Sequence, residues 1–169
     1  MNTNKIRLRL AHPEELSTVL DFLKEAAQWL QAKGVDYWQD WHSPPQNYID
    51  SIHNGFAKDE FYIVEYDEKI IGCFRLQWDD ECFWGQQKAD AGYIHSFTIA
   101  RHLAGKKIGV KVLNEIERIC QKNGKNLLRL DCGAEAEGLR RYYEQYGFVM
   151  VGTTTVSDKE LTLYEKSIC

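Results

Sequence analysis

The stretch YIHSFTIARHLAGKKIG, residues 93–109, contains the transition that decides how the chain folds. Residues 93–99 are mostly apolar, aromatic or β-branched, as in a strand. A loop with two glycines follows, and apolar residues then recur at helical spacing over residues 109–123. The apolar face of that helix consists of Val112, Leu113, Ile116 and Cys120. The sequence therefore predicts a strand, a loop and a helix in direct succession.

Similar patterns extend outward from this centre in both directions. On the N-terminal side, we expect strands at residues 6–10, 60–66 and 70–78, a helix from Pro13 to Gly34, and a short helix at residues 46–54 that ends at Gly55. On the C-terminal side, we expect a strand at 127–132, a helix at 137–146 that ends at Gly147, and strands near 148–155 and 161–166. Residues 79–92 are expected to form a loop-like insertion. This order predicts one mixed α/β domain spanning residues 1–169, a length that suits a single domain.

The composition excludes several classes of function. A formal net charge of −4 argues against a general nucleic-acid or anionic-membrane role. No apolar run approaches the roughly 18 residues that span a bilayer, so we expect a cytoplasmic protein. The cysteines are odd in number and lack metal-ligand spacing, so we expect them to be reduced and mostly buried, with no metal site. These cysteines are Cys73, Cys82, Cys120, Cys132 and Cys169.

Two motifs lie within this order of elements. The first is the loop AGKKIG, residues 104–109, after the central strand, and the second is YEQYGF, residues 143–148, at the end of a helix about 35 residues later. Together they resemble the GNAT superfamily of acyl-CoA-dependent N-acetyltransferases, and the similarity covers nearly the whole chain. Ala104 stands where that family usually has arginine or glutamine, Lys107 stands at a usual glycine, and Ala136 replaces a frequent asparagine.

The resemblance implies a GNAT-like α+β domain with a central mixed, mostly antiparallel sheet of about seven strands and about four flanking helices. It also implies acetyl-CoA as co-substrate. The pyrophosphate of the coenzyme would bind at the loop, because amides at a helix start attract anions. A plain helix-capping turn with a solvated basic start is the alternative for this loop. The cofactor-binding residues that the resemblance implies are Phe97, Thr98, Ile99, Ala104, Gly105, Lys106, Lys107, Ile108 and Gly109.

The catalytic assignments combine the resemblance with side-chain chemistry. The family register makes Tyr143 the general acid that protonates the leaving thiolate, although this ring or that of Tyr142 would also serve to pack the helix. His95 adjoins the cofactor strand and titrates in a useful range, so it is the preferred base for the attacking amine; a structural histidine is the alternative. Three carboxylates remain as further base candidates: Glu81, Asp90 and Asp131.

The acceptor is sought near two segments that combine aromatic and acidic residues, 35–41 and 77–84. Trp38, Trp41 and Glu81 suit a cation, whereas indoles that fill the core or a dimer surface are an equally open interpretation. The expected function is transfer of an acetyl group from acetyl-CoA to a primary amine of a small molecule or peptide, by direct attack in a ternary complex. The alternative is a non-catalytic acyl-CoA-binding or protein-interaction module, and a homodimer is left open.

Overall fold

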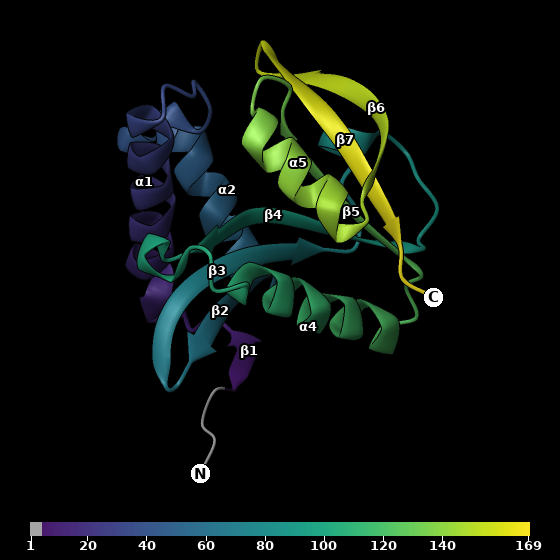
Figure 1. Cartoon of the computed structure of the whole chain (residues 1–169), viewed down its shortest axis with the longest axis horizontal. Helices are drawn as coiled ribbons and strands as arrows, with labels where there is room; N and C mark the ends of the chain where they lie inside the picture. The colour runs from purple at the N-terminus through teal and green to yellow at the C-terminus, as the bar shows by residue number, and fades with distance from the viewer. Residues whose placement is uncertain (1–4) are drawn as a thin grey trace. The chain divides into compact units, whose positions relative to one another are not determined.

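The computed structural model describes residues 5–169, so the first four residues of the predicted domain lie outside it. In the described part, seven strands form one sheet in the order β1-β2-β3-β4-β5-β7-β6. The strands are β1 (Ile6–Leu10), β2 (Phe61–Tyr66), β3 (Lys69–Gln77), β4 (Ala91–Ile99), β5 (Leu127–Gly133), β6 (Val149–Val156) and β7 (Lys159–Ser167). The helices are α1 (Leu16–Ala32), α2 (Gln46–Ala57), α3 (Glu81–Trp84), α4 (Ile108–Lys122) and α5 (Glu137–Tyr146). Figure 1 shows their course along the chain.

The predicted fold class is confirmed. The β4–β5 pair is parallel, and the pairs β1–β2, β2–β3, β5–β7 and β6–β7 are antiparallel. Residues 5–169 contain five α-helices where about four were expected, because α3 forms a single turn inside the insertion predicted to be a loop.

Two predicted helix boundaries differ from the structure. Residues Pro13–Glu15 form a 3₁₀ turn, and α1 begins only at Leu16. The helix expected to stop at Gly55 continues to Ala57. Gly55 is a packing residue rather than a helix end, since a Cβ at this position would lie 2.5 Å from the Phe61 ring. The sequence pattern does not distinguish these two uses of glycine.

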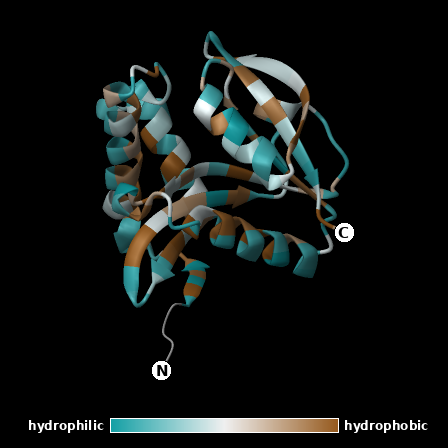
Figure 2. Ribbon diagram, in the orientation of Figure 1, coloured by the Kyte–Doolittle hydropathy of each residue, from teal (hydrophilic) through white to brown (hydrophobic). Residues whose placement is uncertain are grey.

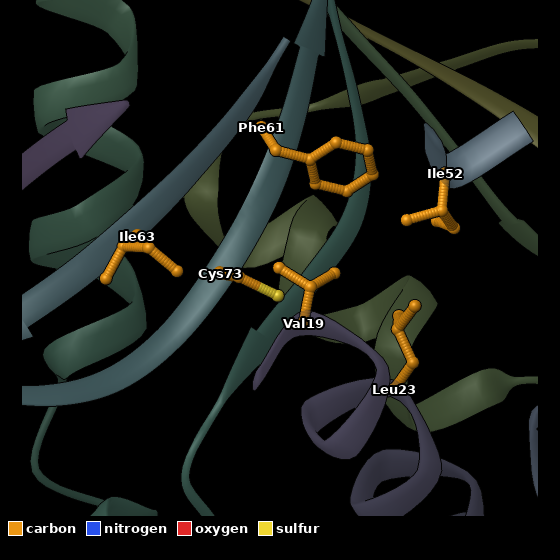
Figure 3. Packing of buried hydrophobic residues seen from close by; sticks show 6 residues of the cluster. All are labelled: Val19, Leu23, Ile52, Phe61, Ile63 and Cys73. Atoms are coloured by element: carbon orange, nitrogen blue, oxygen red, sulfur yellow. The ribbon is translucent and has the colours of Figure 1, made fainter. Parts of the chain in front are cut away.

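The chain divides into two compact units, the first comprising residues up to Arg75 together with Ser96–Val112. Within this unit, α1 and α2 contact each other (Figure 1). Its core brings together Val19 and Leu23 from α1, Ile52 from α2, Phe61 and Ile63 from β2, and Cys73 from β3 (Figure 3). All six are at most 3 % exposed, so Val19 and Leu23 of α1 lie on a buried face of this helix.

The second unit comprises Leu76–His95 and Leu113–Cys169. It contains β5, β6, β7, α3, α5 and most of α4. Figure 2 shows apolar and hydrophilic residues alternating along α4, as expected for an amphipathic helix. The predicted apolar face of α4 is fully buried, with Val112, Leu113, Ile116 and Cys120 each at 0 % exposure. No helix in residues 5–169 is long and apolar enough to cross a membrane.

Candidate active site

The second unit contains a cluster of three polar side chains, Asp80, His95 and Asp131. His95 Nε2 lies 2.7 Å from Asp80 Oδ2, and His95 Nδ1 lies 3.5 Å from Asp131 Oδ2. The side chains of Asp80 and Asp131 are only 5 % and 7 % exposed, while that of His95 is 17 % exposed. An imidazole is thus held between two nearly buried carboxylates.

The parallel pairing of β4 with β5 explains why His95 and Asp131 meet. The register runs from Ala91 opposite Leu127 to Ile94 opposite Leu130, and His95 and Asp131 are the next residues on the two strands. Side chains alternate along a strand, so each of them shares a face with the residue two positions earlier. Those earlier residues, Tyr93 and Arg129, are hydrogen-bonded at 2.8 Å. The cluster therefore continues a polar pair on the same face.

The short helix α3 contributes the third group and covers this face. Asp80 is the residue immediately before α3. Phe83 of the helix packs on His95 with ring centroids 4.8 Å apart, and Trp84 lies against Tyr93 at 5.8 Å. The insertion predicted to be a loop thus shields His95 and supplies its carboxylate partner.

Burial raises the pKa of Asp131 to about 6. The charge of His95 opposes this rise, and the carboxylate of Asp80 adds to it because two like charges lie close together. Within residues 5–169, no group forms a hydrogen bond with the buried Oδ2 of Asp131. The cluster can therefore take up a proton close to neutral pH.

The cluster also has the dimensions of a metal-binding group, since one ligand atom of each side chain lies within 4.8 Å of the others. The short distance between His95 and Asp80 does not require an ion, because Nε2 of His95 forms a hydrogen bond with Asp80. The predicted absence of a metal stays a prediction.

Tyr143, the predicted general acid, lies in α5 of the same unit and is 8 % exposed. Its ring packs edge-on against Tyr142 and Phe148, with centroid distances of 5.4 and 5.8 Å. The predicted end of this helix is confirmed, because Gly147 follows Tyr146 with a left-handed φ of 107°. The helix and its terminal glycine fix the ring of Tyr143 in a packed position.

The predicted cofactor loop lies in the first unit, immediately before α4. Residues 104–107 are exposed, and Gly105 and Lys107 have positive φ values of 79° and 56°. The amides of Ala104 and Lys106 already donate to the carbonyls of Arg101 and Leu103, whereas the first amides of the 15-residue α4 have no partner within the helix. Backbone donors at the start of α4 are therefore available for an anion, which fits the pyrophosphate of a coenzyme A.

The strand residues predicted to contact the cofactor, Phe97, Thr98 and Ile99, form the end of β4 in the first unit. Thr98 is 4 % exposed, and its hydroxyl lies 3.3 Å from the Cys73 thiol. Because the side chain of Thr98 is buried, the strand can contact a ligand at this position only through its backbone.

The predicted acceptor residues are not brought together within one unit. Trp38 and Trp41 belong to the first unit, where both pack partly buried against its core. Glu81 begins α3 in the second unit and is exposed. Both indoles thus bury part of their surface against the core of the first unit.

The cysteines are free thiols, and three of them are buried as predicted. Burial raises the pKa of Cys73, Cys120 and Cys132 to about 12 in each case. A thiol with such a pKa is not a nucleophile near neutral pH. A structural role for Cys132 is therefore favoured.

Asp80 is the functional candidate that sequence reasoning missed. In the sequence it is one of several acidic residues in segment 77–84, where the acceptor prediction falls on Glu81. Asp131 is among the base candidates that the sequence predicts, but only the parallel register of β4 and β5 places it beside His95. No pattern in the sequence relates Asp80 to His95.

Comparisons with known proteins are consistent with this architecture. A sequence model described as the acetyltransferase (GNAT) family matches residues 22–148. An uncharacterized N-acetyltransferase of Bacillus subtilis, YesJ, is 24 % identical over 159 residues, which cover 88 % of this chain and 87 % of that protein.

Solved structures show the same fold. A GNAT-family acetyltransferase from Listeria monocytogenes superposes with a TM-score of 0.75 at 22 % identity, covering 96 % of this chain and 94 % of the other. The aminoglycoside acetyltransferase AAC(6′)-Ib, in complex with coenzyme A and kanamycin, superposes with a TM-score of 0.72 at 17 % identity, covering 96 % and 95 % of the two chains.

Proposed function

Because the chain belongs to the GNAT family of acetyltransferases, we propose that it transfers an acetyl group from acetyl-CoA to a primary amine of a small molecule or peptide. The family is one of acyltransferase enzymes that use acetyl-CoA. The observation that carries the proposal is the family match over residues 22–148, which includes β4, the loop before α4 and α5. The kanamycin complex of the structurally similar AAC(6′)-Ib supports a small-molecule amine as acceptor.

In this proposal, acetyl-CoA supplies an activated thioester, and the amine attacks it directly in a ternary complex. The segment at residues 104–109 binds the pyrophosphate through the first backbone amides of α4, because the start of a helix favours an anion. Backbone groups of residues 97–99 pair with the pantetheine arm, and one amide stabilises the charge that develops on the carbonyl oxygen. Side-chain identity matters little at these positions, so Ala104 and Lys107 are compatible with binding.

Two side chains of the second unit handle protons. His95, held by its carboxylate neighbours, takes a proton from the ammonium form of the acceptor, which must lose one before it attacks. Tyr143 gives a proton to the sulfur of the leaving coenzyme A. The new bond joins the amine nitrogen to the acetyl carbon, and the bond that breaks joins this carbon to sulfur.

Binding of the co-substrate is tested by thermal denaturation with acetyl-CoA, with ATP and NAD as controls. Ligand at 100 times its dissociation constant adds about 2.7 kcal/mol, or roughly 5–10 °C for a chain of this size. A selective shift supports the cofactor loop. No shift at high acetyl-CoA concentration would favour the alternative, a protein-interaction module that has lost the cofactor.

Activity is tested by release of the coenzyme A thiol with a panel of aminoglycosides, polyamines and peptide amines. In the presence of a responding amine, Tyr143→Phe is expected to lower kcat by about 10²-fold or more, the lower end of what acid catalysis contributes. Tyr142→Phe is the matched control on the same helix. Equal turnover and pH profiles in the two variants would remove Tyr143 from the mechanism.

A further inference from the structure

The three side chains of the His95 cluster form a continuous chain of contacts. Asp80 Oδ2 lies against Nε2 of His95, and Asp131 Oδ2 lies against Nδ1. The first contact, at 2.7 Å, is a short hydrogen bond, whereas the second, at 3.5 Å, is too long for a good one. The two nitrogens of one ring are thus held differently.

The short contact fixes the tautomer of His95. An ionised carboxylate only accepts hydrogen bonds, so Nε2 must carry the hydrogen that Asp80 binds. Nδ1 is then the nitrogen that gains or loses a proton. Asp80 thereby turns the basic lone pair of His95 toward Asp131.

The longer contact, between Nδ1 of His95 and Oδ2 of Asp131, becomes a hydrogen bond only when one of the two atoms carries a proton. Without one, the lone pair of Nδ1 and an ionised oxygen of Asp131 face each other across 3.5 Å, and no other group in the described part of the chain bonds Asp131 Oδ2. One added proton converts this repulsion into a hydrogen bond, whichever of the two atoms carries it. Because the oxygen is buried, water does not offer an equivalent bond.

We propose that Asp80, His95 and Asp131 form one proton-accepting unit, in which Asp80 positions His95, and Nδ1 of His95 with Asp131 receives the proton lost by the acceptor amine. This inference rests on the proposed acetyl transfer and names the groups that make its base effective. The proton moves from the ammonium nitrogen to the Nδ1–Oδ2 pair, and the net charge of the unit changes from −2 to −1. Its negative charge attracts a cationic acceptor.

The surroundings are consistent with this role. Burial raises the pKa of Asp131 to about 6, so this carboxylate takes up a proton closer to neutral pH than an ordinary aspartate does. Two charged groups of the same unit are occupied elsewhere or exposed: Arg129 bonds Glu165 of β7 at 2.7 Å and Tyr93 of β4, and Glu81 of α3 is exposed. Phe83 covers the ring of His95 and limits its hydration.

The experiment compares wild type with Asp80→Asn, Asp131→Asn and His95→Gln, with His53→Gln as an exposed control on α2. Nitrogen-15 NMR of the histidine rings reports the tautomer of His95 and its titration without any substrate. Wild type is expected to show hydrogen on Nε2, and Asp80→Asn is expected to lose this preference. An unchanged tautomer in Asp80→Asn would overturn the positioning role.

The second readout is the pH dependence of kcat with a responding amine. Loss of a negative charge in Asp80→Asn should move the acidic limb to lower pH and reduce kcat by about 10- to 100-fold, part of the ~10²–10⁴-fold that a general base contributes. The KM for acetyl-CoA is expected to stay constant. Acidic limbs that coincide in wild type, Asp80→Asn and Asp131→Asn would overturn the inference while leaving acetyl transfer intact.

Two further outcomes are decisive. If Asp80→Asn loses the tautomer preference but no amine releases thiol with wild type, the catalytic role is overturned together with the proposed function, although the positioning by Asp80 stands.

Calorimetric titration with Zn²⁺ tests whether the same three side chains bind a metal ion instead. Tight stoichiometric binding that His95→Gln abolishes would overturn the proton-accepting unit in favour of a metal site.

Discussion

The loop before α4 and the cluster around His95 handle charge in opposite ways. The loop at residues 104–107 is exposed and presents backbone amides, whereas Asp80 and Asp131 are nearly buried and act through their side chains. Backbone donors tolerate substitution, because every residue except proline has the same amide. Buried polar side chains tolerate substitution poorly, because a replacement leaves the neighbouring polar atoms without their partners. The two regions should therefore respond differently to mutation.

The largest effect is expected from the cluster. His95→Gln removes the proposed base, so kcat/KM should fall by about 10²–10⁴-fold, the range that general-base catalysis contributes. The measurement is thiol release across pH 6–9 with a responding amine, with His53→Gln as the control. Activity within about threefold of wild type would show that His95 is structural, the alternative that the sequence left open.

Replacement of Asp131 tests the energetic cost of the same cluster. The folded-state pKa of about 6 exceeds the ordinary value of 3.8, so the folded protein binds more protons between these values, and its stability falls as pH rises through this window. A difference of about two pKa units corresponds to an upper limit of about 3 kcal/mol at pH 7.5. Asp131→Asn should therefore raise the free energy of unfolding at pH 7.5, and this advantage should vanish near pH 4.

Urea unfolding at the two pH values measures this effect, with Asp21→Asn as an exposed control on α1. If Asp131→Asn is less stable than wild type at pH 7.5, burial of the carboxylate is compensated by contacts that the mutation breaks. Such a result would show that the buried cluster does not lower the stability of the folded protein, and this part of the comparison with the loop would be wrong.

A smaller effect is expected in the loop, where only the backbone conformation matters. Gly105→Val places a branched side chain at a φ of 79°, with a conformational cost of about 1–2 kcal/mol. The KM for acetyl-CoA should rise by about 10-fold if the loop gives up its conformation to relieve that strain. Gly34→Val, at a φ of 71° after α1, is the matched control. Equal KM values for the two variants would separate the loop from cofactor binding.

The smallest effect is expected at Lys107. Lys107→Gly keeps the amide and relieves a left-handed φ of 56°, so the KM for acetyl-CoA should change less than about threefold and stability should rise by less than about 1 kcal/mol. Asp59→Gly, with a φ of 55°, controls for the relief of strain alone. A large loss of affinity in Lys107→Gly only would mean that the ammonium group itself binds a phosphate.

Much of the fold was predictable because it follows local patterns. The apolar spacing of Val112, Leu113, Ile116 and Cys120 predicted a buried helix face, and the structure confirms it. The antiparallel strands β2 and β3, predicted at residues 60–66 and 70–78, are joined by a turn at Asp67 and Glu68. The single turn of α3 was not predictable, since four residues are too few for a helical period to emerge.

The sequence by itself determined the order of elements, the buried helix faces and the position of the loop before α4, because these depend on residues close together in the chain. Only the tertiary structure decided that Asp80, His95 and Asp131 meet. Asp80 and His95 are 15 residues apart, and Asp131 lies on another strand, so the parallel register of β4 and β5 and the position of α3 had to be known. The pKa of Asp131 was likewise decided by burial and by neighbouring charge, neither of which local sequence specifies.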